Sequence, residues 1–176
     1  MTILSATPIL ETPRLRLVVP SAGHLAAHEA FLASDRAAAR GWGAMPHDAW
    51  RSFAEICGHC TLRGFGPFIA EARSDGHVVG IFGPWHPGGQ PEGEIKWSVW
   101  PEADEGRGLA YEAALAVRAY AYRALGWATA VSYINPDNTR SAALARRLGA
   151  VIDHQWATPR GTLIDVWRHP AAGAGA

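Results

Sequence analysis

The sequence predicts an α/β protein with a mixed, mostly antiparallel central sheet and helices on both faces. Three observations support this fold class. Strand and helix patterns follow in the order β-α-α-β-β-β-α-β-α-β-β, two strand pairs read as hairpins, and a central strand-helix-strand unit requires parallel pairing. The 176 residues contain no internal repeat or Ser/Pro-rich linker. We therefore expect a single domain over residues 1–170 and a flexible tail over residues 171–176.

The first strand and the first two helices follow from hydrophobic periodicity and turn residues. Residues 14–20, RLRLVVP, alternate and then become apolar, which is typical of a strand. A helix is predicted over residues 21–34, because Ser21 is a suitable N-cap and apolar residues follow at helical spacing. A loop broken by glycine and proline over residues 40–48 leads to a second helix over residues 48–62.

The middle of the chain reads as three successive strands. Residues 66–73 and 77–85 flank the turn SDG, which predicts a hairpin. Residues 93–100, GEIKWSVW, alternate as the next strand. Its two faces carry Ile95, Trp97 and Val99, and Glu94, Lys96, Ser98 and Trp100.

The last third alternates helices and strands. An alanine-rich helix is predicted to end at Leu125, where Gly126 supplies a helix stop. A strand over residues 128–136 and a short helix over residues 137–149 follow. A closing hairpin pairs residues 150–157 with residues 162–169, as two alternating runs on either side of a turn.

Charge and hydropathy argue against several classes of partner. The formal net charge is zero, whereas nucleic-acid and anionic-membrane binders need a positive field. No apolar run approaches the roughly 20 residues that span a bilayer. The N-terminus lacks the basic start and apolar core of a signal peptide. We expect a cytoplasmic protein that binds neither nucleic acid nor membrane.

Two cysteines, Cys57 and Cys60, form the tetrapeptide CGHC. This spacing resembles a thioredoxin-type redox site, but such a site needs a helix N-terminus to lower the thiol pKa. Here the motif falls near the end of a predicted helix, where the dipole disfavours a thiolate. Two buried thiols are the favoured interpretation, a redox protein is the alternative, and no metal site is expected.

The stretch DEGRGLAYEAA places Gly106, Arg107 and Gly108 directly before a helix. Backbone N–H groups at a helix start lack internal partners, and the helix dipole makes that end partly positive. Glycines let successive N–H groups converge on an anion, and an arginine adds a charge-assisted bond. Neither a P-loop nor a complete dinucleotide fingerprint is present. A different phosphate-binding turn is predicted, with an ordinary loop-to-helix turn as the alternative.

Four segments together resemble the GNAT N-acetyltransferase superfamily, in the branch of ribosomal-protein N-terminal (RimJ/RimL-like) acetyltransferases. The family motif Gln/Arg-x-x-Gly-x-Gly/Ala falls on residues 105–110, EGRGLA, with AYEAALAV as the helix start. TPRLRL resembles the opening strand, GEIKWSVWPE the fourth strand, and NPDNTRSAALARRLGA the last helix of that branch. The resemblance covers roughly residues 12–167. The departure is Glu105 at the Gln/Arg position, which we expect to point into solvent.

The resemblance implies an acetyl-CoA-dependent N-acetyltransferase of the GNAT fold, in which the fourth and fifth strands are parallel and splay apart. The cofactor's pyrophosphate would lie on the glycine turn, and its pantetheine arm between the two splayed strands. No metal is implied. The implied cofactor-binding residues are Trp97, Ser98, Val99, Gly106, Arg107, Gly108, Leu109, Ala110, Asn135, Asn138 and Ser141.

The implied chemistry is direct attack of a primary amine on the thioester in a ternary complex. Oxyanion donors are expected from N–H groups of a bulged fourth strand. Ser141 would assist the leaving thiolate, unless it only bonds its own backbone, and Tyr133 is the second candidate. Asn138 either caps its helix or bonds the cofactor arm. Glu94 is the candidate general base, with His86 as its rival.

Acceptor recognition is expected from two aromatic segments. Trp42, Trp85 and His86, together with Trp50, would wall a slot for an amine, or would only anchor two long loops. Neither segment holds an acidic cluster, which disfavours a polycationic acceptor. The acceptor is a protein N-terminus or a small molecule, and a homodimer is compatible with the family. The alternative function is an inactive, CoA-binding or regulatory protein of the same fold.

Overall fold

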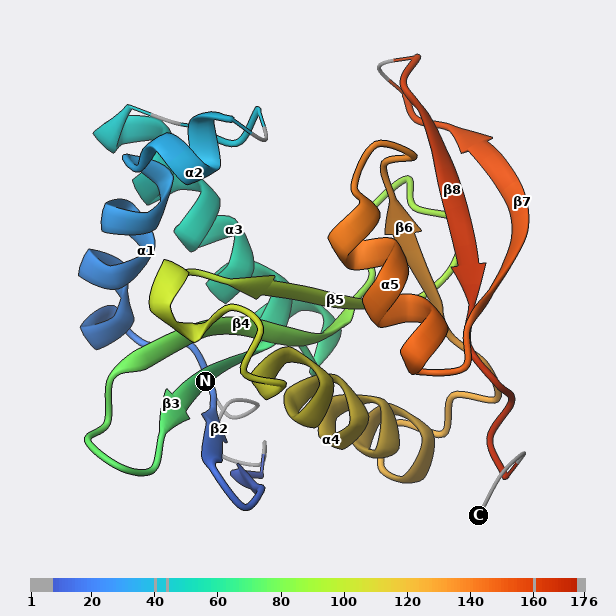
Figure 1. Cartoon of the computed structure of the whole chain (residues 1–176), viewed down its shortest axis with the longest axis horizontal. Coiled ribbons are helices and arrows are strands. Elements are labelled where there is room, and N and C mark those ends of the chain that lie inside the picture. Colours follow the sequence, from blue (N-terminus) through green and yellow to red (C-terminus); the bar gives the residue numbers. More distant parts are fainter. Residues whose placement is uncertain (1–7, 40, 44, 160, 174–176) are drawn as a thin grey trace.

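The structure is a computed structural model that describes residues 8–39, 41–43, 45–159 and 161–173. Its centre is one eight-stranded sheet with the order β1-β2-β3-β4-β5-β6-β8-β7 (Figure 1). The strands are β1 (Leu10–Glu11), β2 (Leu15–Val18), β3 (Phe68–Ala72), β4 (Val78–Trp85), β5 (Glu94–Val99), β6 (Val131–Ile134), β7 (Val151–Ala157) and β8 (Leu163–Arg168). Within the described residues only β5 and β6 are parallel neighbours, so the predicted mixed, mostly antiparallel sheet is confirmed.

Helices cover both faces of this sheet, as the sequence predicts (Figure 1). They are α1 (Leu25–Leu32), α2 (Asp35–Ala38), α3 (Pro46–Arg63), α4 (Leu109–Arg123) and α5 (Thr139–Arg147), with the 3-10 turns η2 (Ala22–His24) and η3 (Glu102–Asp104). Helix α4 packs on one face of β2 to β5, while α1 and α3 pack on the other. Helix α5 forms a smaller core with β6 and β8.

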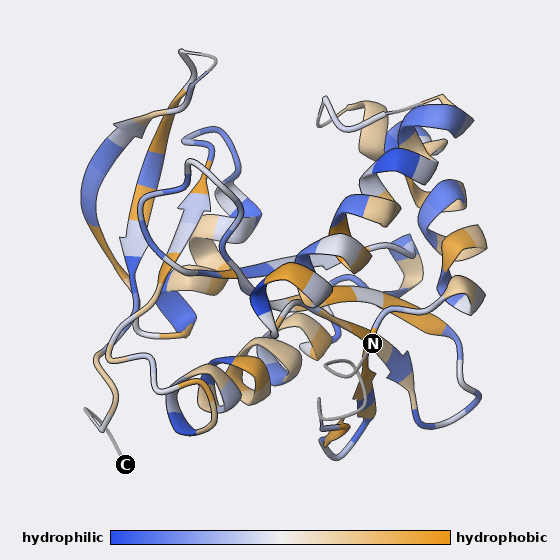
Figure 2. Cartoon of the chain, turned by 180° about the vertical axis from the view of Figure 1, so that it is seen from behind, coloured by the Kyte–Doolittle hydropathy of each residue, from blue (hydrophilic) through white to orange (hydrophobic). Residues whose placement is uncertain are grey.

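The central strands are apolar because both of their faces are buried. In β3, Phe68 and Ala70 belong to the core under α4, and Ile69 between them belongs to the core under α1 and α3. This follows from the two-residue period of a strand. Figure 2 shows the resulting hydrophobic colouring along the central strands and α4.

Strands β5 and β6 run side by side but pair at one position, Glu94 with Val131. There the Val131 N–H donates to the Gly93 carbonyl oxygen at 3.1 Å. Beyond this pair the two strands separate, which confirms the splayed parallel strands that the resemblance implies. The separation leaves one edge of β5 without a neighbouring strand.

A buried polar chain fixes the point where the strands part. The Ser132 hydroxyl of β6 donates to the Ile95 carbonyl of β5 at 2.6 Å and accepts from His169 Nε2 at 2.9 Å. The Arg118 guanidinium donates to His169 Nδ1 at 3.3 Å, so Nε2 carries the ring proton. Burial lowers the pKa of His169 to about 3, which keeps the imidazole neutral. We call Ser132, Ile95 and His169 the strand strut.

Several boundaries differ from the sequence prediction for local physical reasons. Helix α3 begins at Pro46, two residues before the predicted start, because the fixed φ of proline suits the first helical position. The predicted first helix opens as a 3-10 turn before Leu25, although Ser21 does form the N-cap through its N–H bond to His24 Nδ1 at 3.0 Å. Helix α2 was not predicted, and Ser34 caps it.

The C-terminal elements are shorter than predicted. Helix α4 ends at Arg123, two residues before the predicted end. The Leu125 N–H bonds the Tyr120 carbonyl five residues back at 3.4 Å, and Gly126 takes a left-handed φ of 71°. Strand β6 keeps four residues, since only they pair with β8. Of the predicted tail, Ala172 donates a backbone bond to the Ala128 carbonyl, and residues 174–176 lie outside the described residues.

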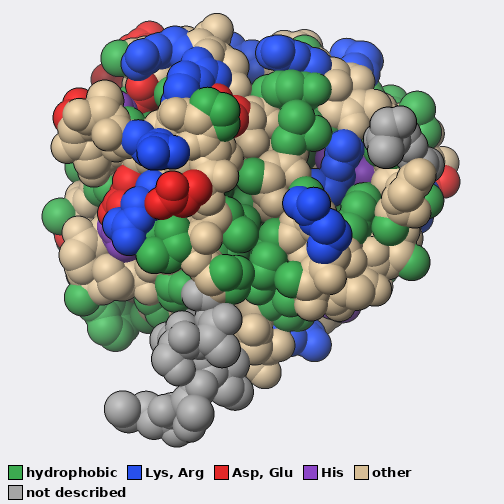
Figure 3. Space-filling model, turned by 90° about the horizontal axis from the view of Figure 1, so that it is seen from below, with side chains coloured by type: hydrophobic (Ala, Val, Ile, Leu, Met, Phe, Trp, Pro, Cys, Tyr) green, Lys and Arg blue, Asp and Glu red, His purple; other side chains and the backbone are tan. Residues whose placement is uncertain are grey.

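Charged side chains do not gather into a field of one sign on the face seen in Figure 3. Arginines and carboxylates are interspersed there with hydrophobic side chains. This arrangement agrees with the formal net charge of zero. In the part of the chain that the structure describes, no helix combines the length and apolarity needed to cross a membrane.

Candidate active site

The turn between η3 and α4 presents a run of backbone N–H groups. Gly106 and Gly108 have left-handed φ values of 72° and 78°, a conformation that costs other residues about 1–2 kcal/mol. Gly108 is the N-cap of α4. The first hydrogen bond of this helix runs from the Glu112 N–H to the Gly108 carbonyl oxygen. Among the described residues, the N–H groups of residues 106–111 make no backbone hydrogen bond. This is the geometry of an anion site.

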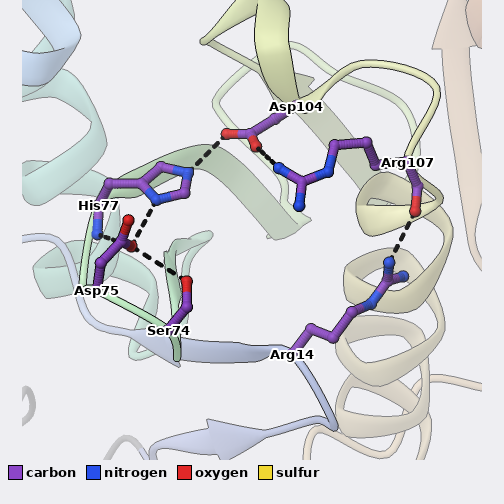
Figure 4. Close-up of polar contacts among 6 residues, drawn as sticks. All are labelled: Arg14, Ser74, Asp75, His77, Asp104 and Arg107. Atoms are coloured by element: carbon purple, nitrogen blue, oxygen red, sulfur yellow. Dashed lines mark hydrogen bonds and ion pairs between the residues drawn. The ribbon is translucent and has the colours of Figure 1, made fainter.

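Side chains beneath the turn hold it in place (Figure 4). The Asp104 carboxylate, 2% exposed, accepts from His77 Nε2 at 2.8 Å and from the Arg107 guanidinium at 2.9 Å. The Arg14 guanidinium donates to the Arg107 carbonyl at 2.8 Å and to Glu112 of α4 at 2.7 Å. The side chain of Arg107 therefore binds Asp104 in this structure.

The His77 contact predicts a pH-dependent stability. Hydrogen bonds to Asp75 and then Asp104 raise the pKa of His77 above its ordinary value of about 6.5. A histidine whose pKa is raised in the folded state stabilises the fold while it is protonated. Its contribution is complete below the unfolded-state pKa and is lost as pH rises through the folded-state pKa. In urea denaturation, the free energy of unfolding of the wild type should exceed that of His77→Gln most at about pH 6. This difference should shrink toward about pH 9.

A matched background separates the two acid partners of His77. In an Asp104→Asn protein the same His77→Gln substitution should cost less at about pH 6, because one of the two carboxylates is gone. If the difference in unfolding free energy between wild type and His77→Gln stays constant or grows with rising pH, the assigned ion pair is contradicted.

Glu105 lies at the rim of the turn in a bridge between two arginines. Its carboxylate contacts Arg36 at 2.8 Å and also contacts Arg140, in the first turn of α5. Arg36 donates in addition to the Val99 carbonyl at 2.9 Å. The expectation that Glu105 points into solvent is therefore wrong, since the two cations offset the desolvation of the carboxylate.

A cavity of ≈ 600 Å³, here called the turn cavity, lies between this turn and α5. Nine of the eleven predicted cofactor-binding residues line it. They are Trp97, Ser98, Val99, Gly106, Gly108, Leu109, Ala110, Asn138 and Ser141. Arg36, Arg140 and Arg147 also line it, together with the carboxylates of Asp104 and Glu105, so the walls carry one more cation than anions.

The splayed edge of β5 opens onto the turn cavity. Ile95 and Val99 both direct their carbonyls away from β4, toward Ser132 and Arg36. Because N–H and C=O of one strand residue point to the same side, the N–H groups of Trp97 and Val99 face the gap. The predicted bulge was wrong: β5 pairs with β4 without a register shift, so the separation of β6 alone exposes these donors.

Ser141 lies where the splayed strands and α5 meet. Its hydroxyl oxygen accepts from Trp97 Nε1 at 3.2 Å, and its N–H donates to Asn138 Oδ1 at 3.1 Å. Asn138 therefore is the N-cap of α5. Because the indole N–H occupies a lone pair, the hydroxyl proton of Ser141 is available to donate.

A second cavity, of ≈ 510 Å³, is called the aromatic cavity and lies on the α1–α3 side. Five residues line both cavities: Trp42, Trp97, Ser98, Asn138 and Ser141. The two cavities therefore meet at the free edge of β5. Trp85, Tyr133, Asn135 and Glu94 line only the aromatic cavity.

Glu94 and Tyr133 carry the titratable groups of this junction. Burial raises the pKa of Glu94, although Lys96 and a 3.2 Å hydrogen bond from Gln90 Nε2 oppose the shift. The Tyr133 hydroxyl accepts from the Glu92 N–H at 3.2 Å and keeps its own proton, since burial raises its pKa. A carboxyl with a raised pKa in a cavity is a candidate proton acceptor.

Some predicted residues lie elsewhere, and some lining residues were missed. His86, Trp50 and Arg107 line neither cavity; His86 is hydrogen-bonded to His59 and to the Gln90 carbonyl. Lys96 lines the aromatic cavity and was not among the predicted site residues. Its place two residues after Glu94, on the same strand face, was the available signal.

The cysteine pair lies inside α3, close to its C-terminal end. Burial raises the pKa of Cys60 to about 11 and also raises that of Cys57, and both thiols are free. A redox site needs the opposite shift, so the geometry favours buried thiols. Among the described residues, no three or more His, Cys, Asp or Glu side chains are grouped to hold a metal ion.

Comparison with known proteins gives consistent matches. The family model of the GNAT acetyltransferase domain matches residues 14–151. An acetyltransferase from Agrobacterium tumefaciens str. C58 is 32% identical, with a TM-score of 0.83 over 94% of this chain and 95% of that chain. A GNAT-family acetyltransferase from Bordetella pertussis is 26% identical, with a TM-score of 0.78 over 93% of this chain and 100% of that chain.

A more distant structure is informative for the fold. RimL, a ribosomal L7/L12 alpha-N-protein acetyltransferase solved in complex with coenzyme A, is 15% identical to this chain. Its TM-score is 0.74, over 96% of this chain and 100% of that chain. At this identity the likeness shows a shared fold.

Proposed function

Because the chain belongs to the GNAT acetyltransferase family, we propose that it transfers an acetyl group from acetyl-CoA to a primary amine. The amine attacks directly, within a ternary complex. The observation that carries this proposal is the meeting of two cavities at one open strand edge, with Trp97 and Ser141 in the walls of both. One cavity suits a phosphate-bearing cosubstrate, and the other suits an amine.

The residues of the turn cavity fit coenzyme A. The six consecutive N–H groups of residues 106–111, which make no backbone hydrogen bond within the described part of the chain, can bind the pyrophosphate. A Cβ built on Gly106 meets no atom within 4 Å, so the space above the turn is open. Arg140 and Arg147 add positive charge to the same walls. Coenzyme A is bound in the solved RimL structure, which has this fold.

Bound there, acetyl-CoA supplies the thioester carbonyl carbon and the thiolate leaving group. Glu94, directly or through one water, takes the proton that the amine loses as its nitrogen forms the new C–N bond. The N–H groups of Trp97 and Val99 donate to the carbonyl oxygen as it gains charge.

The same step breaks the C–S bond, and the sulfur needs a proton. Ser141 is the donor, because Trp97 Nε1 holds its oxygen and leaves the hydroxyl proton available. Tyr133 is the second candidate for this single proton donor. The proton that Glu94 accepts balances the proton that the sulfur gains. No acyl-enzyme is formed.

An inactive coenzyme A-binding protein is the second candidate, because glutamate replaces the usual Gln/Arg at position 105. The ion pairs of Glu105 with Arg36 and Arg140 weaken this argument for an inactive protein, because they neutralise the carboxylate locally. A thiol-release assay with acetyl-CoA and a panel of primary amines separates the two. Amine-dependent release supports the enzyme; tight binding of coenzyme A without release supports the inactive protein.

Gly106→Ala is expected to raise the dissociation constant for coenzyme A about tenfold, measured by calorimetry. The new methyl group enters the phosphate space and causes the loss of affinity. The left-handed φ of 72° disfavours alanine by about 1–2 kcal/mol and lowers the stability of the fold.

Gly126→Ala is the matched control for this substitution. It has the same left-handed φ, at 71°, and the same open surroundings, but lies beyond the other end of α4. Both variants should lose similar stability in urea denaturation, and only Gly106→Ala should lose affinity. If Gly106→Ala and Gly126→Ala bind coenzyme A with equal affinity, the phosphate does not lie on this turn.

A further inference from the structure

Lys96, the chain's only lysine, lines the aromatic cavity. Its Nζ lies 4.4 Å from the centroid of the Trp85 ring. Within the described part of the chain, Nζ makes no hydrogen bond and no salt bridge. The side chain is half-buried. A cation in such a position is normally paired with an anion.

The electrostatics around Lys96 show that its charge is costly. Burial lowers its pKa, and attraction to Glu94 and Glu55 opposes the shift. Neither carboxylate reaches salt-bridge distance in the described structure. A ring face attracts an ammonium more weakly than a paired carboxylate does. An anionic group brought by a ligand would restore the missing pair.

The other walls of the aromatic cavity add no second cation. Phe31, Trp85 and Trp100 are buried and give an apolar wall. Burial lowers the pKa of His28, also in the wall, to about 4, which keeps its imidazole neutral at pH 7. Among the described lining residues, Lys96 is the only Lys or Arg, and Glu55 and Glu94 are the carboxylates.

Strand geometry sets Lys96 at a useful distance from Glu94. The two residues are two positions apart on β5, so their side chains share one face. Their Cα atoms are therefore about 7 Å apart, at about 3.3 Å per residue. An acceptor whose amine lies at Glu94 can place a second group a few bonds away beside Lys96.

We propose that the acceptor is a small amine of amino-acid type: a primary amine, an apolar or aromatic body, and a carboxylate that pairs with Lys96. This inference rests on the proposed function and names its substrate class. The amine lies at Glu94, and the body packs on Phe31 and Trp100.

The kinetic test uses matched acceptors on the full protein with acetyl-CoA. One series is phenylalanine, phenylalaninamide and phenethylamine, and the other is tryptophan, tryptophanamide and tryptamine. The amino acid should exceed its amide in kcat/KM about 10- to 100-fold, since a charge-assisted bond contributes about 1.5–3 kcal/mol. An amide as good as its acid in both series would overturn the proposal.

Lys96→Met separates the subsite from intrinsic reactivity. The acid-to-amide ratio should fall to about one-tenth of its wild-type value or less in this variant, because differences in amine basicity cancel between the two proteins. Arg123→Met removes an exposed charge at the end of α4 and should keep the wild-type ratio. An unchanged ratio in Lys96→Met would also overturn the proposal.

A binding measurement distinguishes failure of this inference from failure of the proposed function. Calorimetry with 3-phenylpropanoate and 3-phenylpropanamide needs no amine and no acetyl transfer. Tighter binding of the acid, lost in Lys96→Met, supports the subsite even if no amine is acetylated. Equal binding, or no binding of either ligand, overturns the subsite even if simple amines are acetylated.

Discussion

Replacing Ser141 with alanine is expected to lower turnover about 100-fold and to leave the affinity for coenzyme A unchanged. The hydroxyl is held by the Trp97 indole, and its proton is needed only as the C–S bond breaks. Loss of a group that acts in the transition state lowers kcat, whereas loss of ground-state contact raises Kd. Steady-state thiol release and calorimetric titration measure the two quantities separately.

Two further variants test this role of Ser141. Trp97→Phe keeps the hydroxyl but removes the N–H that orients it, so we expect a smaller loss, about tenfold. Thr139→Val removes an exposed hydroxyl from the same turn of α5, outside both cavities, and serves as the control. Wild-type turnover in Ser141→Ala would exclude the serine as a proton donor.

Replacing Glu94 with glutamine is expected to lower kcat/KM about 1000-fold and to alter its pH profile. A base works only when it is deprotonated. Because burial raises the pKa of Glu94, wild-type activity should decline as pH falls through a value above the ordinary carboxylate range. Glu94→Gln should lack this limb of the profile, since the amide does not titrate.

The same substitution should not unfold the protein. A raised folded-state pKa means that the ionised carboxylate destabilises the fold as pH rises through that pKa, so a neutral amide is expected to be tolerated at pH 7. His86→Gln tests the rival base, and Glu55→Gln removes another carboxylate of the same cavity. If His86→Gln loses the acid limb and Glu94→Gln retains it, the assignment of the base is wrong.

The sequence predicted features that depend on neighbouring residues. Gly106 and Gly108 could be identified because a left-handed turn before a helix demands glycine. Asn138 could be identified as a helix cap because its side chain bonds an N–H three residues later. The alternation of β5 likewise gave both faces of the strand.

Features that depend on contacts between distant segments were not predicted. Asp104 meets His77 only because the β3–β4 hairpin folds under the turn. Glu105 was expected in solvent because a carboxylate beside a pyrophosphate is electrostatically unfavourable. Its partners, Arg36 and Arg140, come from two other helices and could not be identified from the sequence. Lys96 lies over Trp85 through the pairing of β5 with β4, which periodicity alone does not set.

The strand strut has a consequence for how the enzyme would receive its substrates. Ser132 and His169 are each 2% exposed, and they hold β6 to β5 at the point of separation. The opening between the strands is therefore pre-organised by the protein interior. Binding of coenzyme A between these strands should therefore order their backbone little further. Amide hydrogen exchange in β5 and β6 should differ little between the empty and the coenzyme A-bound protein.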